Sequence, residues 1–402
     1  MAVAVSDDQR ILLRLLSNAL FREELPKTLG DPVGLWREAN QQAVALLAFA
    51  NVDISCEPED LQREIRFACK KSLAANLQIA RGHIDLSRML EDAGIRHVMI
   101  KGLVSALHYP SPELRKLGDV DFYVDPSDVE KTEAFLKENG FEALKVSHGF
   151  HHVFAKDFCR FELHFGLPGV PEGERGEVCK ALFRDLLSRS TVVPTAFGPM
   201  RIPCAFHQGL ITVLHMAHHL TNSGFGLRHL CDWAVFSARY SDDGFCEEFS
   251  SALKSVGLWR FACCLNDLCA RYLGAPEKIK SVYYDKTLAE GLIGDIFDAG
   301  NFGQKDVVRS REAYMITSGE DVGRSKKMVR LLKDMVYQKW PASRRNPILV
   351  PLGFGYFGAE YLLRSAAGRR PKLHAREAVR GAKSRTALYD RLELYEFEKE
   401  QP

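Results

Sequence analysis

Residues 115–124 read Arg-Lys-Leu-Gly-Asp-Val-Asp-Phe-Tyr-Val, and this stretch decides the fold expected of the chain. Its apolar residues alternate with Asp119, Asp121 and Tyr123, which predicts a β-strand with one buried face. The two carboxylates would stand side by side on the other face. Two like charges held so close repel each other, and a cation between them relieves the repulsion. Mg²⁺ suits this place because it takes oxygen ligands and usually completes its shell with substrate phosphates.

A second alternating stretch, residues 158–165, reads Phe-Cys-Arg-Phe-Glu-Leu-His-Phe and predicts another strand. It places Arg160, Glu162 and His164 on one face and three apolar residues on the other. If this strand lies beside the first one, Glu162 completes an acidic triad with the two aspartates. Such a triad can hold one or two metal ions that activate an attacking oxygen and neutralise charge on a transferred phosphoryl group.

Upstream of the acidic strand, residues 94–100 predict a short apolar strand that leads directly into Lys101 and Gly102. Residues 103–108 then predict a helical turn. A glycine at a strand-to-helix turn lets the backbone approach a phosphate, and the helix N-terminus favours the negative charge. Lys101 would add a point charge for the same phosphates.

Several basic side chains near these strands are candidates for contacts to substrate. Arg115 lies just before the acidic strand, and a guanidinium can grip a phosphate bidentately. His152 or His164 could serve as a base or as a phosphate contact. We interpret His148 and His151 as polar residues of a hairpin.

The acidic residues have a simpler explanation, which is an exposed strand edge whose charges prevent aggregation. That explanation gives no reason for a Lys-Gly turn upstream or for a second acidic strand downstream. We therefore favour a functional site.

The order of strand, Lys-Gly turn, helix, Arg-x3-Asp-x-Asp strand, helix and Glu162 strand resembles the polymerase-beta-type nucleotidyltransferase superfamily. It is similar in particular to a bacterial branch of uncharacterised nucleotidyltransferases. The resemblance is strong over residues 86–167 and looser on either side. The resemblance implies that Asp119, Asp121 and Glu162 bind the metal. It also implies that Lys101 and Gly102 lie at the phosphates of the nucleotide.

The chain departs from the superfamily at the turn, where most members have Gly-Ser. Here Leu103 follows Gly102, and the nearest hydroxyl, our candidate for the nucleotide contact, belongs to Ser105. The main hypothesis is a Mg²⁺- or Mn²⁺-dependent enzyme that moves a nucleoside monophosphate from a nucleoside triphosphate to an unknown hydroxyl or phosphate acceptor. A non-catalytic nucleotide-binding or interaction protein that retains the fold is the second hypothesis, and a phosphotransferase that uses the terminal phosphate is the third.

The alternation of apolar patterns predicts an α+β fold with a small mixed sheet and helices on one side. We expect a helical layer over residues 1–93, whose last helix packs on the sheet, and a nucleotidyltransferase core over 94–203. A hairpin within 190–202 would extend the sheet or cover the site. Residues 204–320 would form a helical domain that covers the site, followed by a basic, aromatic C-terminal helical region over 321–402.

The expected helical domain is rich in histidine. His215 and His219 are one helical turn apart, and His218 and His229 are close in sequence. No glutamate follows His215 as a zinc-hydrolase motif requires. We therefore favour packing histidines, some of which face the cleft, over a zinc site.

Arg228 and Asp232 also lie one helical turn apart, which predicts an i,i+4 salt bridge. The alternative is that Arg228 reaches substrate phosphate.

Charge, cysteine content and apolar segments bear on the partners and the cellular location of the protein. A net charge of +2 over 402 residues leaves any argument about partners to local patches. The ten cysteines include no Cys-x2-Cys pair, so we expect reduced thiols without disulfide partners. No secretory signal is visible, and charge and glycine interrupt the apolar stretch 347–363. We expect a cytoplasmic protein.

Residues 324–385 are rich in Lys and Arg, with aromatic residues interleaved. Peripheral contact with an anionic membrane surface, nucleic-acid binding and a solvated helical face all fit this pattern.

Overall fold

The computed structural model describes most of the chain as far as residue 305 and short stretches beyond it. The described residues are 5–148, 150–171, 174–240, 243–276, 285–305, 349–356 and 387–395, with 340, 343, 346 and 385. One compact unit comprises 1–220, 224–306 and 391–402, and a second comprises 221–223 and 307–390. The basic segment 324–385, for which membrane contact, nucleic-acid binding and a solvated helical face were the interpretations, lies largely outside the described residues.

The N-terminal region is helical, as predicted. Its helices are α1 (Asp7–Phe21), α2 (Pro32–Gln41), α3 (Ala45–Phe49) and α4 (Glu59–Asp92). Ser6 begins α1 with a reciprocal capping box, in which its hydroxyl accepts from the Gln9 backbone and the Gln9 side chain accepts from the Ser6 backbone. The Ser17 hydroxyl of α1 donates to the Leu273 carbonyl at 2.8 Å, so α1 packs on the later helices.

A mixed five-stranded sheet forms the centre of the fold, which is α+β as predicted. Its strands are β1 (His97–Met99), β2 (Val120–Val124), β3 (Glu142–His148), β4 (His151–Lys156) and β5 (Cys159–His164), in the order β1-β2-β5-β4-β3. Strands β2 and β5 are parallel neighbours, and Asp121 pairs in register with Glu162. The condition set by the sequence, that the two acidic strands lie side by side, is therefore met.

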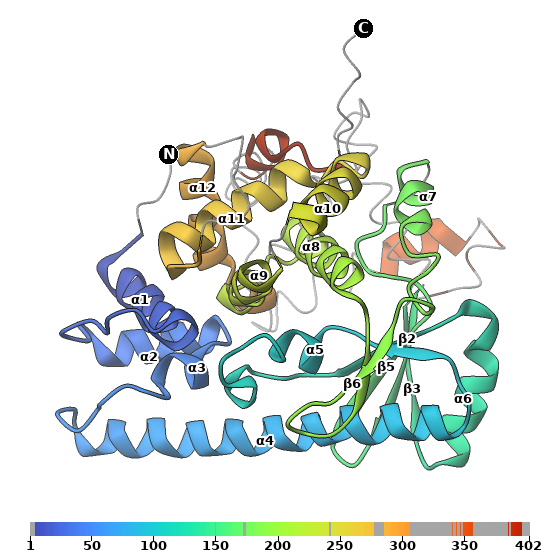
Figure 1. Cartoon of the computed structure of the whole chain (residues 1–402), viewed down its shortest axis with the longest axis horizontal. Helices are drawn as coiled ribbons and strands as arrows, with labels where there is room; N and C mark the ends of the chain where they lie inside the picture. Colours follow the sequence, from blue (N-terminus) through green and yellow to red (C-terminus); the bar gives the residue numbers. More distant parts are fainter. Residues whose placement is uncertain are drawn as a thin grey trace, which may run out of the picture. The chain divides into compact units, whose positions relative to one another are not determined.

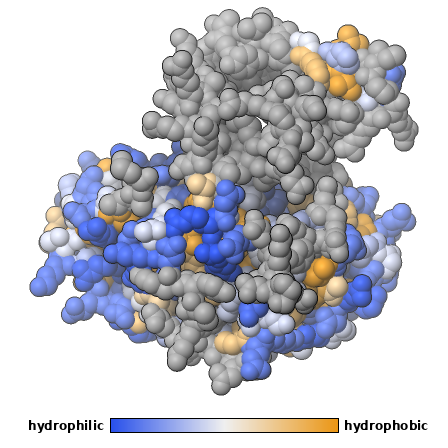
Figure 2. Space-filling view, turned by 90° about the horizontal axis from the view of Figure 1, so that it is seen from above, coloured by the Kyte–Doolittle hydropathy of each residue, from blue (hydrophilic) through white to orange (hydrophobic). Residues whose placement is uncertain are grey.

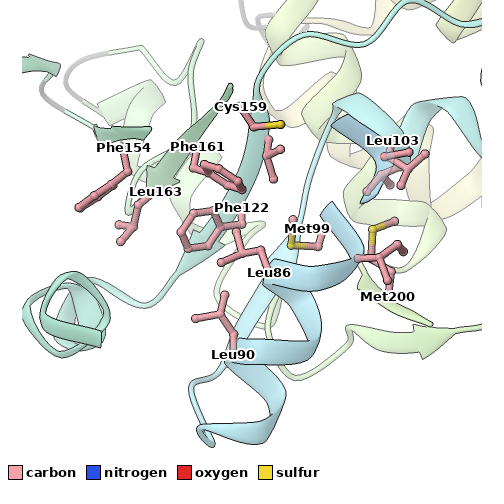
Figure 3. Close-up of a cluster of buried hydrophobic side chains, with 14 of the residues drawn as sticks. Leu86, Leu90, Met99, Leu103, Phe122, Phe154, Cys159, Phe161, Leu163 and Met200 are labelled. Carbon is pink, nitrogen blue, oxygen red and sulfur yellow. The ribbon is translucent and has the colours of Figure 1, made fainter. Parts of the chain in front are cut away.

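The apolar face of the sheet is covered by α4 and by α6 (Val129–Glu138), which follows β2. Side chains of Phe122 from β2 and Phe161 from β5 gather with Leu86 and Leu90 of α4 in one buried cluster, as Figure 3 shows. Burial of such side chains stabilises each by about 1.5–3 kcal/mol. Because the apolar set faces α4, the acidic set must face the other side of the sheet.

The predicted hairpin forms from β6 (Thr191–Val193) and β7 (Met200–Ile202). It follows α7 (Glu174–Ala181) and makes a separate two-stranded sheet. Arg201 pairs with Glu91, and its backbone N–H donates to the Ser87 hydroxyl at 3.1 Å, so the hairpin packs against α4. The expectation that it extends the sheet or covers the site was wrong, because the anchoring side chains lie on α4.

Helices dominate the next region, as the sequence predicts. They are α8 (Ala205–Thr221), α9 (Leu227–Arg239), α10 (Asp243–Ser255), α11 (Trp259–Leu273) and α12 (Lys286–Ala299), and a 3₁₀ turn at Asn301–Gly303 follows. A short helix, α5 (Gly102–Ala106), lies between α4 and the pair α8 and α9 (Figure 1). This arrangement places α8 and α9 over the turn that precedes α5.

The visible described surface in Figure 2 mixes hydrophilic and hydrophobic residues. Large hydrophobic side chains such as Phe67 and Phe158 are exposed singly, which is ordinary for a folded protein. Among the described helices, none combines the length and the apolar character that a membrane crossing needs.

Candidate active site

A cavity of about 240 Å³ lies between the acidic ends of β2 and β5 and the helices α8 and α9. Seven of the eight residues predicted from sequence line it: Lys101, Gly102, Ser105, Arg115, Asp119, Asp121 and Glu162. The helices and the 3₁₀ turn add Thr212, His215, Met216, His219, Arg228, His229, Asp232 and Phe302. The sheet side of the cavity therefore carries three carboxylates, and the helix side carries Arg228 and three histidines together with Asp232.

Asp121 is the most firmly held carboxylate of the site. Its Oδ1 accepts from Lys101 Nζ at 3.0 Å and bonds His164 Nε2 at 2.8 Å. Burial would raise the pKa of Asp121, but the charge of Lys101 and the bond to His164 outweigh it and hold the pKa below its usual range. Asp121 is therefore ionised at neutral pH, in a fixed orientation.

Asp119 has the opposite environment. Burial, together with the negative charges of Glu162 and Asp121, raises the pKa of Asp119 to about 6. Arg160 Nε lies 3.5 Å from Asp119 Oδ1 and offsets part of this effect. The three carboxylates thus repel one another, and their oxygens are the ligand type that Mg²⁺ or Mn²⁺ prefers. The donor set fits a divalent cation.

His164, predicted to contact nucleotide, does not line the cavity. It is fully buried behind Asp121, and its Nε2 also lies 3.4 Å from Glu162 Oε2. His151, interpreted as a polar hairpin residue, is buried instead, with Nε2 3.8 Å from Glu162 Oε2. His152 bonds Glu133 of α6 rather than the site. Alternation along β4 separates these two histidines onto opposite faces.

The Lys-Gly turn has unusual backbone geometry. Lys101 has φ 54° and ψ −146°, a backbone conformation that residues other than glycine rarely adopt. Gly102, which follows it, has φ +37°. A Cβ at Gly102 would lie 2.8 Å from Nε2 of His83, a buried residue of α4. The glycine is therefore required by the close approach of α4, a reason that the sequence did not reveal.

We expect Gly102→Ala to lower the free energy of unfolding by about 2–3 kcal/mol. A positive φ costs a residue with a Cβ about 1–2 kcal/mol, and the contact with His83 adds strain. Chemical denaturation measures the change. Gly140→Ala is the matched control, because Gly140 has φ +80° but its Cβ would meet nothing within 4 Å. Equal losses in the two variants would mean that His83 moves aside at no cost.

Arg115, predicted to grip phosphate, is engaged by a carboxylate of the protein. Its Nε and Nη2 donate to Asp232 Oδ1 and Oδ2 at 3.0 and 2.6 Å, and the Tyr109 hydroxyl donates to Asp232 Oδ1 at 2.7 Å. Asp232 therefore pairs with Arg115, and the predicted i,i+4 bridge to Arg228 was wrong. Arg115 therefore makes the bidentate contact expected for a phosphate, but makes it with the carboxylate of Asp232. This ion pair joins the loop before β2 to α9.

Asn76 of α4 holds the same loop from the other side. Its Nδ2 donates to the Glu113 and Arg115 carbonyls at 2.7 and 3.0 Å, and its Oδ1 accepts from the Leu117 N–H at 2.9 Å. The loop that carries Arg115 is thereby fixed before the acidic strand begins. No sequence signal distinguishes this asparagine from other polar residues of a long helix.

Arg228 also lines the cavity, and its guanidinium is less fully bound to the protein than that of Arg115. Its Nη1 donates to the Lys116 carbonyl at 3.4 Å, and its guanidinium lies 5.1 Å from the centre of the Phe302 ring. Its buried Nε has no hydrogen-bond partner among the described residues. Burial and the charge of Arg115 lower the pKa of Arg228 to about 10, so it remains a cation at neutral pH.

Three histidines complete the helix side of the cavity. His215 and His219 lie on one face of α8, with their Nε2 atoms 2.9 Å apart, and His229 lies in the first turns of α9. Burial lowers the pKa of His219 to about 3 and the pKa of the other two well below their usual value. The i,i+4 spacing revealed that His215 and His219 share a face, whereas the sequence showed only that His229 is near them along the chain and gave no sign of Phe302.

A model of one protein family, described as uncharacterised nucleotidyltransferase, matches residues 30–274. The matched segment covers more than half of the chain and runs from before α2 to the end of α11, so it includes every residue named in the cavity wall except Phe302. A comparison with curated proteins gave no match.

Proposed function

The chain belongs to the uncharacterised nucleotidyltransferase family, and we propose that it transfers a nucleoside monophosphate from a nucleoside triphosphate to a hydroxyl or phosphate acceptor. In this proposal Asp119, Asp121 and Glu162 hold Mg²⁺ or Mn²⁺. The observation that carries it is the parallel pairing of β2 with β5, which aligns Asp121 with Glu162 in one cavity wall.

The carboxylates have different proposed roles, because their surroundings differ. A divalent ion bound there would neutralise charge on the phosphates and help to activate the attacking oxygen. Asp121, held by Lys101 and His164, supplies a permanent negative charge in a fixed position. Glu162 faces the cavity and would position the acceptor oxygen or remove its proton.

The cations of the cavity are suited to the phosphates. Lys101 reaches the cavity from the strained turn, and Arg228 reaches it from α9 with an unsatisfied Nε in the described structure. Arg115 remains bound to Asp232 and acts through the loop that it fixes. Lys101 beside the carboxylates and Arg228 on the helix side would orient a metal-bound triphosphate in the cavity.

Thermal unfolding with Mg²⁺ and each of the four nucleoside triphosphates tests the binding half of this proposal. A ligand at about one hundred times its dissociation constant adds roughly 2.7 kcal/mol to the stability of the folded state. We expect a metal-dependent rise of the midpoint with at least one nucleotide. The rise should be absent in Asp119→Ala/Asp121→Ala. A folded protein that responds to none of the four would contradict the proposal.

Labelling of the donor tests the chemical half. Nucleotidyl transfer delivers the α-phosphate label of the donor to the acceptor, whereas a phosphotransferase delivers the γ-phosphate label. A cell extract fractionated by size and charge supplies the candidate acceptors. Binding of nucleotide without transfer of either label would favour a non-catalytic nucleotide-binding protein.

We expect His164→Gln to raise the Mg²⁺ concentration needed for half-maximal transfer by about 10- to 100-fold. His164 touches Asp121 rather than the cavity, and loss of such an outer partner weakens a metal site by this factor. Titration of activity with Mg²⁺ separates this effect from a change in kcat at saturating metal. His152→Gln is the control, because His152 bonds Glu133 of α6. A fall in kcat with an unchanged metal requirement would contradict a positioning role.

A further inference from the structure

The three histidines of the cavity come from two helices. His215 and His219 share one face of α8, and the next helix brings His229 to the same point. One ring nitrogen from each of the three lies within 4.8 Å of the others. Both ring nitrogens of the buried His229 lack hydrogen-bond partners within the described part of the chain. Unsatisfied buried polar atoms are rare, and one reason for them is an ion that the site is built to hold.

The three nitrogens lie close enough together for their rings to converge on one metal ion. Zinc binds imidazole nitrogens at about 2.0–2.1 Å, which places neighbouring ligands about 3.3 Å apart. The Nε2 atoms of His215 and His219 are 2.9 Å apart in a hydrogen bond that a metal ion would replace, so small rotations of the rings suffice for this pair. Packing against Phe302 limits the rings, since its centroid lies 4.7 Å from that of His219 and 5.2 Å from that of His229.

We propose that His215, His219 and His229 form a second metal site, for a dication of the zinc class, on the wall of the cavity opposite the carboxylates. Imidazole suits zinc, cobalt or nickel, whereas carboxylate oxygens suit Mg²⁺ and Mn²⁺. One cavity would thus hold two different metals at chemically different sites.

Three protein ligands leave one position of a tetrahedral metal open. Because all three histidines line the cavity, that position faces the space that a substrate would occupy. Lys101 and Arg228 line the same cavity, and their charges weaken the binding of a bare cation. The same charges favour an anionic fourth ligand, so an oxygen of a phosphate or carboxylate substrate fits this position better than water.

A second trio of described side chains, His151, Glu162 and His164, also brings its ligand atoms within 4.8 Å of one another. This trio shares Glu162 with the carboxylate site, and its His164 Nε2 is occupied by Asp121. A zinc ion bound there would belong to the carboxylate site already described. The experiment must therefore separate the two trios.

Binding of zinc to the full-length chain, without nucleotide, tests the proposal. Protein is stripped with a chelator, loaded with Zn²⁺, dialysed and analysed for bound metal. Loading with Co²⁺ in parallel reports coordination, because four-coordinate Co²⁺ absorbs visible light strongly. We expect one equivalent of zinc that persists in Asp119→Asn/Asp121→Asn and in Glu162→Gln, with a four-coordinate cobalt spectrum.

His229→Gln should weaken zinc binding by more than the roughly 10- to 100-fold expected from loss of an outer-shell group, and should remove the cobalt spectrum. His218→Gln, on the same helix but outside the trio, should retain both. If His229→Gln fails to fold, His219→Gln replaces it, since His219 is less buried.

Three results would overturn the proposal. One is a wild-type chain that retains no zinc, and another is zinc that is lost with Glu162→Gln but not with the histidine variants. The third is stabilisation by inorganic phosphate without zinc that disappears in His229→Gln, which would identify the trio as an anion site. Because no nucleotide is present, each result is independent of whether the chain transfers nucleotides.

Discussion

Replacing Asp121 by asparagine is expected to reduce nucleotidyl transfer by about 10³-fold or more. Asparagine preserves the shape of the side chain but removes the negative charge between Lys101 and His164. Loss of a single preorganised electrostatic group typically costs about 10²–10³ in kcat, and Asp121 in addition is proposed to bind the metal. Transfer of the α-phosphate label at saturating metal and nucleotide measures the effect.

Asp125→Asn is the matched control for this change. Asp125 follows the same strand, outside the cavity, and its carboxylate accepts hydrogen bonds from the Ser127 N–H and hydroxyl. Asparagine is an equally good capping residue, so stability and activity should be unchanged. An Asp121→Asn variant that kept more than about a tenth of the activity would contradict the metal role, because charge is the property that the substitution removes.

The sheet and the acidic wall could be predicted because their signals are local. The sequence of strand β2 alternates apolar and polar residues, so its apolar and acidic faces follow from the order of residues alone. The sequence could not predict that β2 pairs with β5, because alternation shows which side chains share a face of a strand but not which strands are neighbours in the sheet. The structure shows this pairing, and residue Glu162 then lies beside Asp121.

The helix side of the cavity could be predicted only in part. The one-turn spacing of His215 and His219 was visible, but His229 joins them only through the packing of α9 against α8. Arg115 and Asp232 are 117 residues apart in sequence. The sequence predicted a phosphate contact for Arg115 and a salt bridge with Arg228 for Asp232, whereas the structure pairs the two residues with each other. Charged side chains find partners that tertiary packing supplies, and no periodicity encodes that choice.

Asp232→Ala is expected to lower the free energy of unfolding by about 3–5 kcal/mol. Arg115 and Asp232 are only 5% and 6% exposed, so the change leaves a buried guanidinium without its counter-charge. The Tyr109 hydroxyl loses its acceptor as well. Chemical denaturation measures the loss, and Glu177→Ala, which breaks the exposed pair with Lys180, should change the free energy by less than about 1 kcal/mol.

A second variant, which removes both charges, decides whether the cost of Asp232→Ala comes from the stranded charge or from the pair itself. Arg115→Met/Asp232→Leu removes both charges and keeps much of the volume, and replacement of a buried ion pair by packed apolar residues is often neutral in stability. We therefore expect the double variant to be more stable than Asp232→Ala, yet impaired in transfer, because the loop before β2 would lose its bond to α9. A double variant with full activity would show that this bond serves stability alone. Wild-type stability combined with lost transfer would show that the Arg115–Asp232 pair is kept for the geometry of the site.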